Sequence, residues 1–175
     1  MKHNKVLQAS WVDTPLGSML VIADEEGLYL VDFVEKQNIE IEEIGKKMNL
    51  LIVLGKPDPA KKVEKELGEY FCGKLGKFTI PLLSLGSPFQ KKVWEELRNI
   101  PWGKTRSYAE VAAAIGKPSA CRAVGLANGA NPFAIVVPCH RVIRGDGTLG
   151  GYAGGIKRKE WLLQHEKDLS SLMQR

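Results

Sequence analysis

Long apolar runs are absent from this 175-residue sequence, and none approaches the roughly 20 residues that a transmembrane helix needs. The opening segment 1–13 also lacks the apolar core of a signal peptide. Hydrophobic residues make up 44% of the chain and charged residues 26%, which is ordinary for a globular protein. We therefore expect a cytoplasmic protein, or a nuclear one if the source is eukaryotic, with no membrane partner.

Cysteine and histidine are scarce, with three of each. The cysteines lie far apart, which argues against a disulfide framework. No CxxC or HxxxH spacing occurs, and no Cys/His cluster resembles a zinc site. Cys72 lies beside a helical apolar pattern and is expected to be a packed small residue. We expect neither a bound metal nor another cofactor.

Arginine is missing from the first half of the chain. Residues 1–82 hold 11 lysines and 13 acidic residues, a net charge of −2, whereas residues 83–175 hold all seven arginines and a net charge of +7. Such an asymmetry is found in domains that bind polyanions, and guanidinium groups suit phosphates and bases. A solvated basic surface would give the same charge count, so the alternative of a surface that binds no polyanion stays open.

The first half has the pattern of strands followed by helix. Strands are predicted at 6–12, 18–24 and 28–34, and helices at 38–48 and 58–74. In the second helix Asp58 is expected to cap, with Pro59 in the first turn. The Pro/Gly/Ser-rich segment 81–88 is expected to connect two domains.

The second half is helical, with clear start signals. Ser87 and Gln90 predict a capping box at the head of one helix, and Ser107 and Glu110 predict another for 107–116. A third helix is expected over 119–130, with Ser119 as its cap. The last two helices, joined by a short Gly-containing turn, outline a helix-turn-helix, although an ordinary helical hairpin has the same outline. A helix is also predicted over 156–167.

These patterns predict a two-domain α+β/α fold. A small β-sheet plus helix domain is expected over residues 1–82, and a mainly helical domain with the helix-turn-helix over residues 87–175.

The segment "IVVPCHRVIRGDG" at 135–147 places a cysteine beside a histidine. Residues 134–137 predict a short buried strand, and extended backbone would point the side chains of Cys139 and His140 to opposite faces. Cooperation therefore needs a turn after Pro138 or a bridging water. A helix N-terminus would lower the pKa of the Cys139 thiol, and Glu160 is a candidate to orient His140. A packed, inert cysteine is the alternative, but the glycine-rich segment 144–155 favours a ligand site.

"PCHRV" at 138–142 resembles the active-site signature of the O6-alkylguanine-DNA alkyltransferases, and the resemblance extends over residues 87–163. It implies a direct-reversal repair protein that acts once. Cys139 would take the alkyl group from O6-alkylguanine in DNA, and also from O4-alkylthymine. His140 would accept the thiol proton through a water, with Glu160 orienting the imidazole.

The same resemblance implies how DNA is handled. The damaged nucleotide would be flipped out through the minor groove of double-stranded DNA by a monomer, without a cofactor or an obligate protein partner. Tyr108 would bond the flipped guanine, Arg122 would fill the gap in the duplex, and Asn131 would brace the turn below the site. The base pocket would be lined by Val142, Tyr152 and Ala153.

Some features depart from the family pattern. Ala153 stands where many relatives have serine, no N-terminal zinc set is found, and no fused regulatory domain is expected. Three alternatives remain open. They are a lesion sensor without repair activity, which would lack the cysteine; a Cys-His acyl hydrolase, which would turn over; and a plain helix-turn-helix regulator, which would leave Cys139 without a role.

Overall fold

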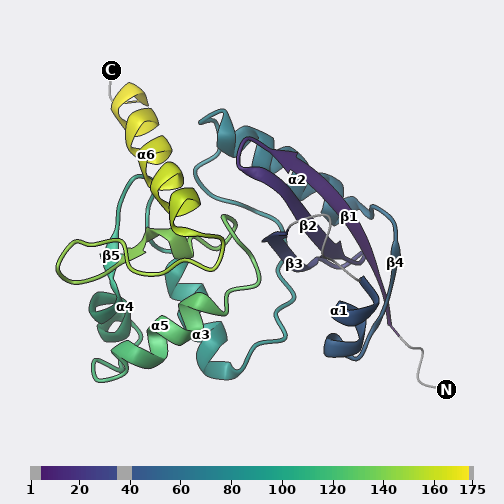
Figure 1. Cartoon of the computed structure of the whole chain (residues 1–175), viewed down its shortest axis with the longest axis horizontal. Coiled ribbons are helices and arrows are strands. Elements are labelled where there is room, and N and C mark those ends of the chain that lie inside the picture. Colours follow the sequence, from purple (N-terminus) through teal and green to yellow (C-terminus); the bar gives the residue numbers. More distant parts are fainter. Residues whose placement is uncertain (1–4, 35–40, 174–175) are drawn as a thin grey trace. The chain divides into compact units, whose positions relative to one another are not determined.

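The computed structural model describes residues 5–34 and 41–173, with side chains as far as residue 170. The chain divides into two compact units, Met1–Leu85 and Gly86–Arg175 (Figure 1). Each unit has its own secondary structure and buried core. No helix in the described part of the chain is long and apolar enough to cross a membrane.

A four-stranded sheet forms the centre of the first unit. Its strands are β1 (Val6–Thr14), β2 (Gly17–Ala23), β3 (Leu28–Phe33) and β4 (Leu51–Leu54). They lie in the order β3-β2-β1-β4, with β1 parallel to β4 and the other pairs antiparallel. The three strands predicted from the sequence are confirmed. The fourth, β4, was not predicted.

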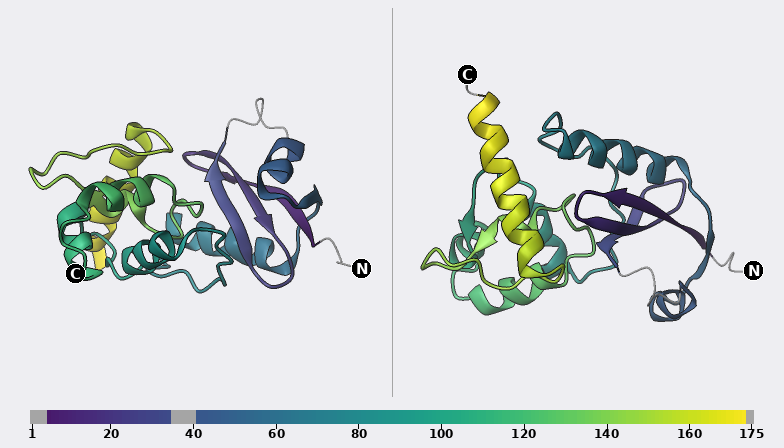
Figure 2. Two further views of the ribbon diagram at one scale, coloured as in Figure 1. Left: turned by 90° about the horizontal axis from the view of Figure 1, so that it is seen from below. Right: turned by 45° about the horizontal axis from the view of Figure 1, so that its top comes forward.

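Helices pack on this sheet and cover its central strands. The helix α1 (Ile41–Met48) packs next to β4, and α2 (Asp58–Phe71) packs on β1 and β2 (Figure 2). Positions 38–40 of the predicted first helix lie outside the described residues. Residues 19–23 of β2 are all buried, as expected for a strand covered on both faces.

Two local predictions for α2 were wrong. The residue at its N-cap position is Pro57, and no side chain caps the helix. Asp58 is instead the first helical residue and accepts a hydrogen bond from Lys61 at 2.9 Å. Cys72, at the C-cap, is exposed rather than packed.

Four helices make up most of the second unit: α3 (Pro88–Leu97), α4 (Tyr108–Ala114), α5 (Cys121–Gly129) and α6 (Ile156–Met173). Two short strands, β5 (Arg106–Ser107) and β6 (Val142–Ile143), pair in parallel. Both predicted capping boxes are present, at Ser87 and at Ser107. The helix α5 begins one residue later than predicted, because Ala120 is its N-cap and no side chain caps it.

The apolar segment 134–137 is buried but is not a strand. Its residues form turns, and Ile135 has a φ of 68°, in the left-handed region that β-branched residues rarely adopt. A single turn of 3₁₀-helix, η2 (Cys139–Arg141), follows directly, with Pro138 at its N-cap. The chain therefore turns after Pro138, and this turn removes the extended geometry that would have separated Cys139 from His140.

Candidate functional site

Cys139 is buried at the first position of η2, and the residue is only 6% exposed. Its backbone is held on both sides, because the Cys139 amide donates to the Val137 carbonyl at 2.8 Å and its carbonyl accepts from Asn128 Nδ2 at 3.3 Å. The cysteine is therefore fixed in one orientation inside the unit.

His140 is fully buried and bonds a carboxylate from α6. Its Nε2 atom lies 2.7 Å from Oε1 of Glu166. Its Nδ1 atom is buried and has no hydrogen-bond partner within the described protein. Burial lowers the pKa of His140 below its ordinary value, and this outweighs the opposite effect of Glu166. The imidazole is therefore neutral, with Nδ1 as its free acceptor atom.

The prediction that Glu160 orients His140 was wrong. Glu160 lies on the exposed side of α6, whereas Glu166 is fully buried. Glu166 shares the buried side of the helix with Leu162 and Lys159. The orienting carboxylate thus comes from the predicted helix, six residues further along the chain.

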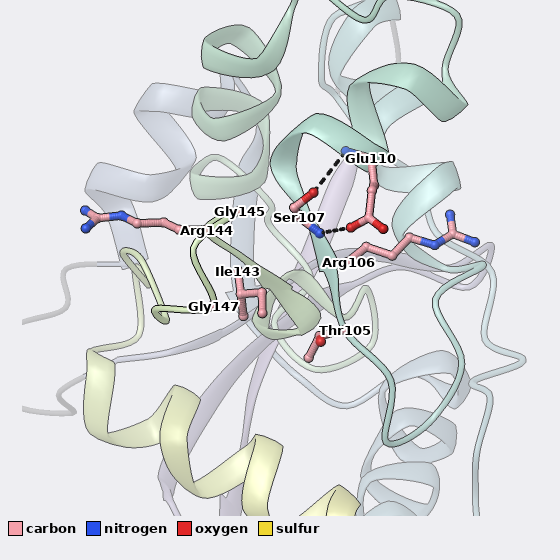
Figure 3. Close-up of a pocket in the computed structure, with 8 residues that line it drawn as sticks. All are labelled: Thr105, Arg106, Ser107, Glu110, Ile143, Arg144, Gly145 and Gly147. Atoms are coloured by element: carbon pink, nitrogen blue, oxygen red, sulfur yellow. Dashed lines mark hydrogen bonds between the residues drawn. The ribbon is translucent and has the colours of Figure 1, made fainter.

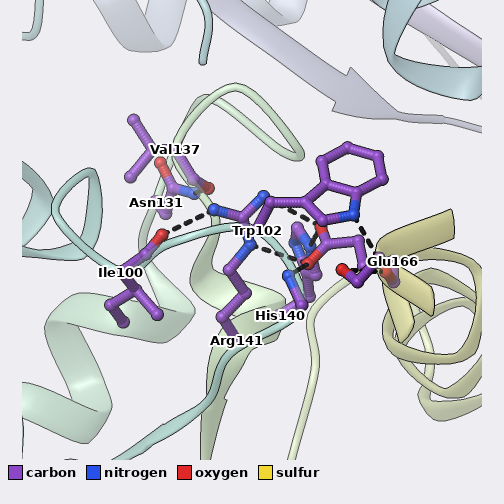
Figure 4. Close-up of polar contacts among 9 residues, drawn as sticks. Ile100, Trp102, Asn131, Val137, His140, Arg141 and Glu166 are labelled. Atoms are coloured by element: carbon purple, nitrogen blue, oxygen red, sulfur yellow. Dashed lines mark hydrogen bonds and ion pairs between the residues drawn. The ribbon is translucent and has the colours of Figure 1, made fainter. Parts of the chain in front are cut away.

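Four donor groups converge on the Glu166 carboxylate. Besides His140, Arg141 donates from Nε at 2.8 Å and from Nη2 at 3.0 Å, and the Gly103 amide donates at 3.2 Å (Figure 4). Burial alone would raise the pKa of Glu166, but His140 and Arg141 outweigh it and hold this pKa well below its ordinary value. The carboxylate is therefore ionised, and Arg141 supplies the permanent countercharge.

Further bonds tie this network to the rest of the unit. Arg141 Nη1 donates to the Ile100 carbonyl at 2.6 Å, and Trp102 Nε1 donates to the Glu166 carbonyl at 2.8 Å (Figure 4). The Glu166 carboxylate and its neighbours Arg141 and Trp102 thereby join three segments of the unit: residues 100–103, η2 and α6. Neither Arg141 nor Glu166 was predicted from the sequence as a site residue.

A buried lysine closes the other side of the site. Lys159 Nζ donates to the carbonyls of Val142 at 2.6 Å, Leu149 at 2.5 Å and Gly151 at 3.2 Å. Burial lowers the pKa of Lys159 to about 8, and the three acceptors use all three N–H groups of the ammonium. Lys159 joins β6 to the glycine-rich segment, and sequence reasoning missed it as well.

Tyr108 begins α4 and lies near the thiol. Burial raises the pKa of Tyr108, and the neighbouring Cys139 raises it further. A Cβ atom at Gly150 would meet Tyr108 Oη at 3.2 Å, so the phenol lies against the glycine-rich segment. The absence of a side chain at Gly150 allows this close approach.

The remaining predicted residues lie at several places around this centre. Asn131 donates to the carbonyls of Phe133 at 3.3 Å and Val137 at 2.9 Å, and it accepts from the Phe133 amide at 3.0 Å. Tyr152 is half-buried and Ala153 is exposed. Arg122 is exposed near the start of α5, on a surface that also includes Ala123 and the largely exposed Leu126.

A separate polar cavity of about 300 Å³ lies beside the β5–β6 pair (Figure 3). It is lined by Thr105, Arg106, Ser107, Glu110, Ile143, Arg144, Gly145 and Gly147. Its charged groups are partly compensated, because Arg106 pairs with Glu96 at 2.6 Å and the Glu110 carboxylate accepts from the Ser107 amide at 2.6 Å. Cys139 is not among its lining residues.

No cluster of three or more potential metal ligands occurs among the residues that the structure describes. The carboxylate and the imidazole of the site are committed to the Glu166 network. The arrangement is suited to proton transfer and nucleophilic attack by a thiol.

Comparison with known proteins covers both units of the chain. Residues 8–83 match the family described as "6-O-methylguanine DNA methyltransferase, ribonuclease-like domain". Residues 88–168 match "6-O-methylguanine DNA methyltransferase, DNA binding domain".

Similar curated proteins carry one shared name. A methylated-DNA–protein-cysteine methyltransferase of Methanosarcina acetivorans is 44% identical over 155 residues, which is 88% of this chain and 94% of the relative. One of Shigella flexneri is 45% identical over 159 residues, covering 89% and 92% of the two chains.

A solved structure extends the similarity to three dimensions. The crystal structure of Mycobacterium tuberculosis OGT in complex with DNA matches with a TM-score of 0.78 and 39% identity, over 94% of each chain. Sequence and fold therefore agree along nearly the whole length.

Proposed function

This chain belongs to the 6-O-methylguanine DNA methyltransferase family, and from that premise we propose how its own residues carry out direct-reversal repair. The reaction moves the alkyl group from O6-alkylguanine in DNA to a cysteine of the protein. The acceptor is Cys139, and the substrates extend to O4-alkylthymine. A single observation supports this assignment most strongly: a buried thiol precedes a neutral histidine whose Nδ1 atom has no partner in the described protein.

The proton leaves the thiol before or during attack. A water between Cys139 and Nδ1 of His140 accepts the thiol proton and passes a proton to the imidazole. Glu166 stabilises the imidazolium that results, because its ionised carboxylate already accepts from Nε2. His140 thus acts as the base: its imidazole is neutral before the reaction and positively charged after it has accepted the proton.

Alkyl transfer then follows as a displacement. The Cys139 sulfur forms a bond to the alkyl carbon, and the bond from that carbon to guanine O6 breaks with its electron pair going to the base. Tyr108 donates a hydrogen bond to the flipped guanine as negative charge develops on it. The product is a thioether, which water does not cleave, so each molecule acts once.

The exposed side of α5 is the DNA-binding surface in this proposal. Small residues and Arg122 let the helix approach the minor groove, where Arg122 takes the place of the extruded nucleotide. The related M. tuberculosis structure holds DNA, which supports DNA as the partner of this chain. The protein acts as a monomer, and phosphate contacts make its affinity fall with salt.

Asn131 and the pocket residues complete the assignment. Asn131 braces the turn before η2 through its bonds to Phe133 and Val137. Val142, Tyr152 and Ala153 line the space for the base.

Two alternatives are separated by chemistry. A lesion sensor would bind the same DNA without a reactive cysteine, and the buried Cys139 beside His140 argues against it. An acyl hydrolase would form a thioester, which turns over, whereas a thioether persists.

The direct test is an intact-mass measurement after incubation with duplex DNA that carries one O6-methylguanine. We expect a gain of one methyl group per protein, located on the peptide that contains Cys139. Cys72→Ala, which removes an exposed thiol in the first unit, serves as the control and keeps the mass gain. An unmodified Cys139 in a protein that still binds the lesion would favour the sensor.

A further inference from the structure

Most arginines of the second unit are already engaged within the protein. Arg106 pairs with Glu96, Arg141 pairs with Glu166, and Arg158 donates to the Gly154 carbonyl at 2.9 Å. By contrast, the side chains of Arg122 and Arg144 make no hydrogen bond or ion pair within the described residues, and both are exposed. An unpaired guanidinium on a DNA-binding unit is available to a phosphate.

The backbone of Arg144 is rigidly held at the base of a turn. Its amide donates to the Thr148 carbonyl at 2.9 Å, and its carbonyl accepts from Gly147 at 3.0 Å. The nearby Asp146 carboxylate accepts from the amide and hydroxyl of Thr148 and forms no ion pair with the guanidinium, although the two charges interact electrostatically. The Arg144 side chain extends away from Ser107 and Arg106 at the cavity (Figure 3). The backbone of Arg144 is therefore held in place, while its guanidinium forms no hydrogen bond or ion pair within the described residues.

Arg144 also lies at the rim of the reaction site. A Cβ atom at Gly150 would lie 3.5 Å from Arg144 Cγ and 3.2 Å from Tyr108 Oη, so the two side chains flank the same point of the glycine-rich segment. The positive charge of Arg144 acts electrostatically on both Tyr108 and Lys159. The guanidinium is thus close to the residues around Cys139 without being part of the proton-transfer network.

We infer that Arg144 binds the backbone phosphate of the extruded nucleotide and so positions that nucleotide for reaction; this inference rests on the proposed repair function. A base that enters a pocket brings its own sugar and phosphate to the pocket rim. A guanidinium whose backbone is held at that rim can meet the phosphate after extrusion. The polar cavity beside β5 is a poorer anion site, because the Glu110 carboxylate lines it.

The roles of Arg144 and Arg122 differ in the substrates whose reaction rate they affect. Arg122 fills the gap that the extruded nucleotide leaves in a duplex, so the reaction with single-stranded DNA does not depend on Arg122. Arg144 acts on a phosphate that single-stranded and duplex substrates share. Free O6-benzylguanine has no phosphate and gains nothing from Arg144. Three substrates therefore separate the two arginines.

The experiment compares Arg144→Gln, Arg144→Lys and Lys167→Gln, the last being an exposed charge on α6 that serves as the control. Single-turnover rates are measured with an O6-methylguanine duplex, the same single strand and free O6-benzylguanine. For each substrate, the rate of the variant is divided by the rate of the wild type. We expect this ratio for Arg144→Gln to be roughly tenfold lower on both DNA substrates than on the free base, which is the effect of losing one charge-assisted hydrogen bond. Arg144→Lys keeps the charge and recovers part of the loss.

Binding adds a readout that a purely structural role would not move. The slope of log affinity against log salt for the single strand should fall by about 0.7 in Arg144→Gln, as for one lost phosphate contact. Equal losses on DNA and on free base would overturn the inference, as would a loss confined to duplex. If Cys139 of the wild-type protein receives no methyl group from the DNA, the proposed function itself is refuted. Failure of the inference on Arg144 and failure of the proposed function therefore give different results.

Discussion

Nε2 of His140 lies 2.7 Å from Oε1 of Glu166, and neither side chain has any exposed surface. The same carboxylate accepts from Arg141 and from the Gly103 amide. An ionised carboxylate accepts hydrogen bonds and cannot donate them, so the imidazole carries its proton on Nε2. Nδ1 is thereby left as the basic atom of the site. Glu166 determines which tautomer of His140 the protein presents.

Replacement of Glu166 by glutamine should therefore slow methyl transfer. The neutral amide of glutamine can bond the imidazole but cannot stabilise the imidazolium, and the expected loss is about 100-fold, within the range of general acid–base contributions. The measurement is the single-turnover rate on a single-stranded O6-methylguanine substrate. Glu160→Gln, an exposed position on the same helix, is the matched control and should react at the wild-type rate.

Folding must be checked in the same variant. Loss of the carboxylate charge leaves Arg141 buried without its partner, which costs about 3–5 kcal/mol. Circular dichroism and the melting temperature show whether the rate was measured on folded protein. A folded Glu166→Gln protein with an undiminished rate would contradict the orienting role, and a slow Glu160→Gln protein would restore the assignment made from sequence.

Stability should fall as the pH drops below about 6.5, the ordinary pKa of histidine in an unfolded chain. Because burial lowers the pKa of His140 in the folded protein, the unfolded state binds this proton first. Its stabilising contribution is present above about pH 6.5 and is lost as the pH falls towards the folded pKa. One such proton changes the free energy of unfolding by up to about 1.4 kcal/mol per pH unit.

Urea unfolding at about pH 7.5, 6.5 and 5.5, on either side of the ordinary histidine pKa, measures this dependence. His140→Gln should remove the slope over the lower half of that range. Glu166, whose pKa is also lowered, acts in the same direction only below about pH 4.3. An unchanged slope in His140→Gln would mean that another group titrates there.

Features of the fold that depend on residues close in sequence were predicted, whereas features that depend on pairing between distant segments were missed. The capping boxes at Ser87 and Ser107 were predicted because their hydrogen bonds span three residues and need no tertiary partner. The strand β4 was missed because its partner in the sheet, β1, lies far earlier in the chain. The predicted strand at 134–137 was wrong, although its burial is confirmed, because an apolar run predicts burial but not backbone conformation.

In the site, too, residues adjacent in sequence were predicted and residues that come together only in the fold were missed or misplaced. Cys139 and His140 were found because they are adjacent in a recognisable motif. The carboxylate was misplaced by six residues, which on an α-helix is a rotation of about 240°. Glu166 follows the buried Leu162 by four residues, so helical periodicity could have distinguished it from Glu160. Arg141 and Lys159 gave no such signal, because most arginines and lysines are exposed.

Arg122→Ala should slow repair of duplex DNA far more than the reaction with free O6-benzylguanine. Extrusion of a paired nucleotide costs a few kcal/mol, and Arg122 is expected to offset part of that cost. A loss of more than about tenfold on duplex relative to the free base is expected. Rapid-quench kinetics on both substrates, with Lys167→Gln as control, measure it. Equal losses on the two substrates would count against a role in extrusion.

Lys159→Met should destabilise the second unit and disturb the pocket at the same time. Methionine fills a similar volume but leaves the carbonyls of Val142, Leu149 and Gly151 without their donor. We expect a loss of about 2–4 kcal/mol, measured by chemical denaturation, since each buried group left unsatisfied costs about 1–3 kcal/mol and water recovers part of this.

Lys157→Met, an exposed position on the same helix, is the control and should stay within about 0.5 kcal/mol of wild type. Because Lys159 joins β6 to the glycine-rich segment, its loss should slow the reaction with free base and with DNA alike. That pattern differs from the one expected for Arg122 and for Arg144, where the loss depends on the substrate. A Lys159→Met protein of wild-type stability would show that water satisfies these carbonyls, and that the lysine is held there for its charge near Cys139 rather than for its bonds.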